Sequence, residues 1–136
     1  MIRLLLLAAA LHAGEWVPME VVATAYDPDC SICCGTRHAN RTANGTNTNE
    51  APYGVAADPR SIPFGTSVWV PTGCGYLDHS LPDERDRCFL VDDTGSALIR
   101  DSRVPGALPH IDLRFIHHAN ARRFGRKVIQ IFIWKE

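Results

Sequence analysis

The sequence carries almost no net charge: 14 Lys and Arg stand against 15 Asp and Glu, which leaves −1 with histidine neutral. A protein dedicated to nucleic acid or to an anionic membrane surface uses a strong basic field, so this balance argues against both partners. The 136 residues are also too few for two ordinary domains. With 46% hydrophobic and 21% charged residues, the composition is that of a globular chain and excludes general disorder.

The sequence also lacks a hydrophobic run long enough to cross a membrane, which needs roughly 20 apolar residues. The short apolar run Leu4–Leu11 follows Arg3 and is followed by small residues up to Ala13 and Gly14. This pattern is typical of a signal peptide, although a buried N-terminal strand or helix has a similar composition. We predict a signal peptide over 1–13, one mature domain over 14–136, no stable membrane span and a location outside the cytoplasm.

Five cysteines fit export, because an oxidising compartment favours disulfides in small domains. Cys74 and Cys88 flank a polar segment, and a bridge between them would close a loop of about 15 residues and contribute about 3 kcal/mol. The other three cysteines are followed by a histidine: Cys30, Cys33, Cys34 and His38. This cluster is compatible with zinc or with a local disulfide; its spacing differs from a standard zinc finger, so we favour the disulfide and predict no metal.

Short runs rich in Val, Ile, Phe and Trp recur between Gly, Pro, Asn and Asp, a pattern that predicts strands. The six predicted strands are Glu20–Tyr26, Gly54–Ala57, Ser67–Val70, Phe89–Val91, Ile111–Phe115 and Val128–Trp134. Six short strands in one domain indicate a small barrel or a sandwich. One helix is predicted over 116–124, ended by Gly125, and residues 36–52 are predicted to form an exposed loop.

Three aspartates lie at or near strand edges: Asp58, Asp93 and Asp112. Asp58 before Pro59 and Asp93 before Thr94 are also what ordinary turns use. Asp112 stands inside a strand, where the alternation of side chains places it opposite Ile111 and Leu113 and on the same side as Arg114. For the same reason Asp92 and Asp93 face opposite sides, so at most one of this pair can join a site.

The chain resembles the 3D domain, a family named for three aspartates and found in bacterial cell-wall lytic enzymes such as membrane-bound lytic transglycosylase A and stationary-phase muralytic proteins. The resemblance rests on four segments in the family's order: ATAYDPDCSICCG, GVAADPRSIPFGTSVWVP, VDDTGSALI and IDLRFIHHANARRFGRKVIQIFI. It covers roughly 21–134 and implies an all-β fold, a six-stranded double-psi β-barrel with one short helix. The insertion at 72–87, the lengthened segment 101–110 and Ser96 depart from the family pattern.

The resemblance implies cleavage of the β-1,4 bond between N-acetylmuramic acid and N-acetylglucosamine, with a 1,6-anhydro product and no cofactor. It assigns Asp112 as the single acid and base, whose pKa must rise from about 3.9. Asp93 and Asp58 would hold the hydrogen-bond network of the site. The residues expected to contact the substrate are Thr24, Tyr26, Thr94, Gly95 and Arg114.

Two other functions are compatible with these residues. A non-catalytic, expansin-like module could bind glycan or loosen the wall on the same barrel, because a fold does not fix a function. A two-aspartate inverting hydrolase would need its carboxyl groups about 6.5–9.5 Å apart around a water. The expected partner is a peptidoglycan glycan strand, bound by a monomer that is secreted or periplasmic and associated with the cell wall, with no nucleic acid involved.

Overall fold

The structure is a computed structural model that describes residues 13–28, 40–71 and 88–136. Six strands close into one barrel in the order β1-β5-β2-β4-β3-β6. The strands are β1 (Glu15–Tyr26), β2 (Val55–Ala56), β3 (Ser67–Trp69), β4 (Cys88–Asp93), β5 (His110–Arg114) and β6 (Lys127–Lys135). All six predicted strands are confirmed, and the longest of them, β1, begins five residues before its predicted start at Glu20.

The barrel mixes parallel and antiparallel neighbours. The pairs β1–β5 and β2–β4 are parallel, whereas β1–β6, β2–β5, β3–β4 and β3–β6 are antiparallel. Closure leaves no free sheet edge, which removes the unpaired backbone groups that an open sheet exposes. This topology is that of an all-β double-psi barrel, as the resemblance implied.

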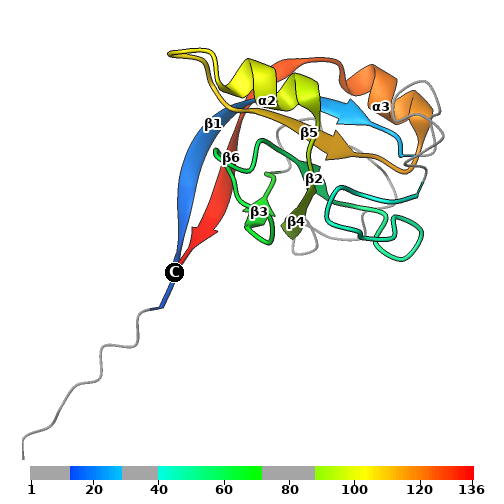
Figure 1. Ribbon diagram of the computed structural model, residues 1–136, viewed down its shortest axis with the longest axis horizontal. Coiled ribbons are helices and arrows are strands. Elements are labelled where there is room, and N and C mark those ends of the chain that lie inside the picture. The colour runs from blue at the N-terminus through cyan, green and yellow to red at the C-terminus, as the bar shows by residue number, and fades with distance from the viewer. Residues whose placement is uncertain (1–12, 29–39, 72–87) are drawn as a thin grey trace, which may run out of the picture.

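The core follows from the two-residue period of the strands. Along β6 the alternate residues Ile129, Ile131 and Ile133 are at most 6% exposed, while Val128 on the opposite face is 58% exposed. β1 and β6 pair over nine residues and form the long ribbon seen in Figure 1. At its far end Trp16 and Trp134 stack edge to face with ring centroids 5.2 Å apart.

Within the described residues two short helices lie on the barrel, where the sequence predicted one. The predicted helix is α3 (His118–Phe124), which buries Ala121 and Phe124 and ends at Gly125 with a positive φ. The helix that the sequence did not indicate is α2 (Ser96–Ser102). Its one buried residue is Leu98, so its short sequence carries no apolar stripe and tertiary packing stabilises it.

The segment 40–52 is not simply an exposed loop, which corrects the prediction for the part of 36–52 that the structure describes. Arg41 and Asn47 form a β-bridge, and the side chains of Thr42 and Thr48 are buried. The backbone N–H of Ala43 donates to Asp93 Oδ1 at 2.8 Å. A segment rich in Asn, Thr and Gly is therefore held against the barrel by its own turns and by β4.

The predicted cysteine pairings fall largely outside the described residues. Cys88 is an exposed free thiol at the start of β4, while Cys74 and the cluster at 30–34 belong to segments that are not described. The predicted Cys74–Cys88 disulfide is therefore not seen among the described residues. The signal peptide stays a prediction, because Ala13 is its only described residue. Within 13–28, 40–71 and 88–136, no helix has the length and apolar character that spanning a bilayer requires.

Candidate active site

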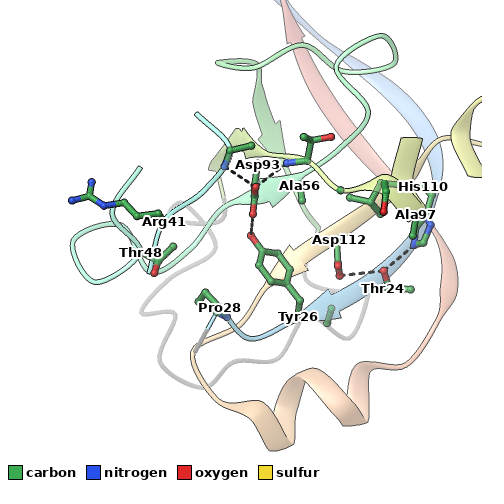
Figure 2. A pocket seen from close by; sticks show the side chains of 16 residues that line it. Thr24, Tyr26, Pro28, Arg41, Thr48, Ala56, Asp93, Ala97, His110 and Asp112 are labelled. Atoms are coloured by element: carbon green, nitrogen blue, oxygen red, sulfur yellow. Dashed lines mark hydrogen bonds between the residues drawn. The ribbon is translucent and has the colours of Figure 1, made fainter. Parts of the chain in front are cut away.

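An open pocket of about 740 Å³ lies across the barrel strands. It is lined by the ends of β1, β4 and β5, by Ala56 of β2, by the first residues of α2 and by the segment 41–48. Figure 2 shows Asp93 and Asp112 in this pocket, with the Tyr26 hydroxyl pointing toward Asp93. The pocket thus collects residues from parts of the chain that lie far apart in the sequence.

Strand register explains why these residues meet. Thr24 of β1 pairs with Asp112 of β5, Asp112 pairs with Ala56 of β2, and Ala56 pairs with Asp93 of β4. Neighbouring strands are about 4.8 Å apart, so the backbones of the two aspartates lie two strand spacings, roughly 10 Å, from each other. The small side chain of Ala56 stands between them and leaves the floor of the pocket open.

Asp93 is a carboxylate held by three donors. The Tyr26 hydroxyl donates to Oδ2 at 3.0 Å, and the backbone N–H groups of Ala43 and Thr94 donate to Oδ1 at 2.8 and 2.9 Å. Hydrogen bonds of this kind to an ionised oxygen are stronger than neutral ones and fix its orientation. Asp93 therefore sits rigidly at one side of the pocket.

Asp112 has a different environment. Its carboxyl group is partly buried and accepts one side-chain hydrogen bond, from the Thr24 hydroxyl to Oδ1 at 3.1 Å. Burial raises the pKa of Asp112 to about 7, Thr24 opposes this by stabilising the ionised form, and the charge of Asp93 adds to the rise. A carboxyl group with such a pKa can donate a proton near neutral pH and take it back.

Arg114 lies in the interior, not in the pocket, which corrects its expected place at the substrate. It shares the face of β5 that carries Asp112, but its side chain is fully buried. Two of its nitrogens donate to the two carboxylate oxygens of Asp92 at 2.8 Å, and the guanidinium also donates to the carbonyls of residues 51–53. Gly54 is needed beside this pair, because a Cβ there would collide with the guanidinium and with Asp92.

The buried Arg114 still acts on the pocket through Tyr26. Arg114 Nη1 donates to the Tyr26 hydroxyl oxygen at 3.2 Å, and that hydroxyl donates onward to Asp93. Burial raises the pKa of the Tyr26 hydroxyl well above its ordinary value, so the group remains a donor. As the alternation predicted, Asp92 and Asp93 face opposite sides, and only Asp93 reaches the pocket.

Asp58 is likewise not among the residues that line the pocket. Its side chain is 1% exposed and accepts two hydrogen bonds from Arg103, at 2.9 and 3.0 Å, together with one from the backbone N–H of Arg60. The bond from Arg103 is the main reason that the pKa of Asp58 is lowered. Asp58 caps the turn at 58–62 and ties it to the C-terminal end of α2, so its position is structural.

The turn after β4, where the family resemblance implies contacts with the substrate, lines the pocket. The Thr94 hydroxyl is buried and has no partner among the described residues, which leaves it available to a ligand. Gly95 has an extended backbone, and a Cβ there would meet only Leu98 at an ordinary 3.9 Å. The protein itself would therefore tolerate a side chain at this position.

The residues that line the pocket include several that were not predicted from the sequence, among them Arg41, Thr48 and His110. His110 carries a detectable signal, because it precedes Asp112 by two residues and a strand period of two puts both on one face. Arg41 and Thr48 carry none, because they stand in a segment that a pattern analysis assigns to a loop. No cluster of three or more His, Cys, Asp or Glu side chains suited to a metal is found within the described ranges.

Fold and site together define a closed β-barrel protein whose open pocket presents two aspartates, one tightly held and one able to carry a proton. The chain belongs to the 3D domain family, whose model matches residues 53–135. It is 33% identical over 117 residues to a Bacillus subtilis (strain 168) protein named "Putative cell wall shaping protein YabE". That alignment covers 85% of this chain and 22% of the relative, so the chain corresponds to a fraction of the longer protein.

Proposed function

We propose that the chain is a peptidoglycan lytic transglycosylase that acts outside the cytoplasm on the cell wall. It cleaves the β-1,4 bond between N-acetylmuramic acid and N-acetylglucosamine and leaves a 1,6-anhydro end. Membership of the 3D family and the name of the Bacillus relative support a role at the wall. The observation that carries the proposed chemistry is Asp112, a pocket carboxyl whose pKa is raised to about 7.

In the proposed reaction Asp112 first donates its proton to the glycosidic oxygen, and the bond from that oxygen to C1 of the muramoyl residue breaks. The C6 hydroxyl of the same residue then attacks C1, and its proton passes to Asp112. The carboxyl group is thereby restored without a water molecule or a second acid. One group with a pKa near the working pH is sufficient for both steps.

The other pocket residues have supporting roles in this proposal. Asp93, fixed by Tyr26 and two backbone N–H groups, stabilises positive charge that develops at C1 and raises the pKa of Asp112. Thr94 offers its hydroxyl to the sugar, and Gly95 lets the sugar approach the backbone closely. Thr24 orients Asp112 through the hydrogen bond to Oδ1.

The test is digestion of purified sacculi followed by mass spectrometry of the released fragments. We expect anhydro-muropeptides from the wild type and at least a hundredfold less from Asp112→Asn, in keeping with the usual contribution of general acid–base catalysis of about 10²–10⁴. Glu20→Gln removes one carboxyl group from the exposed face of β1 and is the matched control. An Asn variant that releases anhydro ends at the wild-type rate removes Asp112 from the mechanism.

A two-aspartate inverting hydrolase is the second candidate, favoured by the register. The backbones of Asp112 and Asp93 are two strands apart, which leaves room for a water between the carboxyl groups. Such an enzyme would leave reducing ends in place of anhydro ends, so the same digestion separates the two. Binding to sacculi without any release would instead indicate a wall-binding module.

A further inference from the structure

Three hydrogen bonds join the pocket carboxyl to the outside of the barrel. Asp101 Oδ2 lies 2.9 Å from His110 Nδ1, His110 Nε2 lies 2.8 Å from Thr24 Oγ1, and Thr24 Oγ1 lies 3.1 Å from Asp112 Oδ1. Figure 2 shows the inner part of this chain, with Thr24 between Asp112 and His110. We call the four residues the Asp101–Asp112 chain. Its members come from α2, β5 and β1.

The number of protons in this chain allows two arrangements. An ionised carboxylate such as Asp101 only accepts, so Nδ1 of His110 carries a proton in both. The Thr24 hydroxyl has a single proton, and its possible acceptors are Nε2 of His110, Oδ1 of Asp112 and the backbone carbonyl oxygen of Ile111 at 3.3 Å. The two arrangements that continue the chain give this proton to Nε2 or to Oδ1. In the first arrangement Asp112 is protonated and His110 is neutral; in the second Asp112 is ionised and His110 is an imidazolium.

We propose that this chain shares one proton between Asp112 and His110, with the Thr24 hydroxyl as the link and Asp101 as the anchor. The proton leaves Asp112 Oδ1 for Thr24 Oγ1 while the hydroxyl proton of Thr24 moves to His110 Nε2. Asp112 becomes negative and His110 positive, so the total charge is unchanged. The inference rests on the proposed function only in giving Asp112 the role of acid. His110 and Asp101 act through Thr24 and are positioning residues.

The surroundings of the chain support this arrangement. The His110 side chain is 7% exposed and its backbone N–H donates to Ser102 Oγ at 2.9 Å, so the ring is fixed in place. Asp101 is 27% exposed, and hydrogen bonds from His110 and Arg100 lower its pKa. The chain thus runs from a solvated carboxylate through a buried ring to the pocket.

Among the described residues, three charged groups lie around the Asp101–Asp112 chain: two arginines near Asp101 and one aspartate near Asp112. Arg100 Nε lies 3.1 Å from Asp101 Oδ1, and Arg126 Nη1 lies 3.9 Å from Asp101 Oδ2. At the pocket end the charge of Asp93 on β4 acts on Asp112. The two arginines favour the ionised form of Asp101, while Asp93 favours the protonated form of Asp112.

The test follows the titration of the Asp112 carboxyl carbon by NMR in a double-mutant cycle, which needs no glycan. An imidazolium at 110 stabilises ionised Asp112, so we expect His110→Gln to move the Asp112 midpoint upward by at least about 0.5 pH unit. The same substitution in a Thr24→Val background should move it by less than about 0.2 unit, because valine has no hydroxyl. Thr24→Ser should restore the larger shift.

Two further variants complete the experiment. Asp101→Asn weakens the hydrogen bond to His110 Nδ1 and should shift the Asp112 midpoint in the same direction as His110→Gln. It replaces His110→Gln in the experiment if that variant does not fold. His117→Gln changes an exposed histidine just beyond β5 and should leave the midpoint unmoved. Equal shifts in the wild-type and Thr24→Val backgrounds, or no shift in either, overturn the proposal. If the titrations are coupled but no anhydro product forms, the lytic function is refuted and the proton sharing stands. If anhydro product forms but the titrations are not coupled, the proton sharing is refuted and the lytic function stands.

Discussion

The raised pKa of Asp112 makes a specific prediction about stability. The unfolded chain loses the Asp112 proton near the ordinary value of 3.8, whereas the folded protein holds it until pH about 7. Between these values the unfolded state binds fewer protons, so the free energy of unfolding falls as pH rises. Asp112→Asn removes this dependence, because an amide stays neutral. The variant should therefore gain stability relative to the wild type as the solution becomes less acidic.

The magnitude follows from the two pKa values. Each pH unit between them changes stability by about 1.4 kcal/mol, so the interval from pH 5 to the midpoint near 7 corresponds to about 2–3 kcal/mol. Groups that are not coupled to Asp112 titrate alike in both proteins and cancel in the difference. We thus expect the stability of Asp112→Asn minus that of the wild type to increase by about 2–3 kcal/mol between pH 5 and pH 8.

Urea denaturation at pH 5, 6, 7 and 8 measures this difference directly, with the midpoint and slope determined for both proteins at each pH. Glu20→Gln is the control for removing one carboxyl group from the surface. A difference between Asp112→Asn and the wild type that stays constant within about 0.5 kcal/mol would refute the reasoning. The electrostatic basis for Asp112 as an acid would then be lost as well.

Three other substitutions test the remaining parts of the site. Asp92→Asn leaves the fully buried Arg114 without its carboxylate and should cost about 3–5 kcal/mol in chemical denaturation, whereas a loss below about 1 kcal/mol would contradict the pairing. Asp58 has a lowered pKa, so its bond to Arg103 stabilises the fold above pH about 4, and this stabilisation is lost at lower pH. We therefore expect Asp58→Asn to be less stable than the wild type at pH 7 and to lose less stability in acid. Thermal melts between pH 2 and 7 measure both effects. Gly95→Ala should keep the melting temperature and lower muropeptide release, and unchanged release would mean that the sugar does not approach this backbone.

The fold was largely predictable because its signals are local. Apolar runs between Gly, Pro and Asn marked all six strands, and alternation within β5 separated Asp112 from the core residues Ile111 and Leu113. The helix α2 was missed because it buries only Leu98. The burial of Thr48 was missed because a polar segment gives no periodic sign that it packs on a neighbouring strand.

The site was predictable only in part. The sequence by itself, through its resemblance to the 3D family, indicated which residues could do the chemistry: an aspartate inside a strand, another at the Asp-Thr-Gly turn, and the threonine and tyrosine of β1. The tertiary structure decided which of them meet, because strand register sets Thr24, Asp112, Ala56 and Asp93 side by side. It also decided that Arg114 is buried in an ion pair with Asp92, that the buried Asp58 carboxylate pairs with the partly exposed Arg103, and that His110 reaches Asp112 through a hydroxyl. Such contacts join residues far apart in the chain, and closure of the barrel brings them within hydrogen-bond distance.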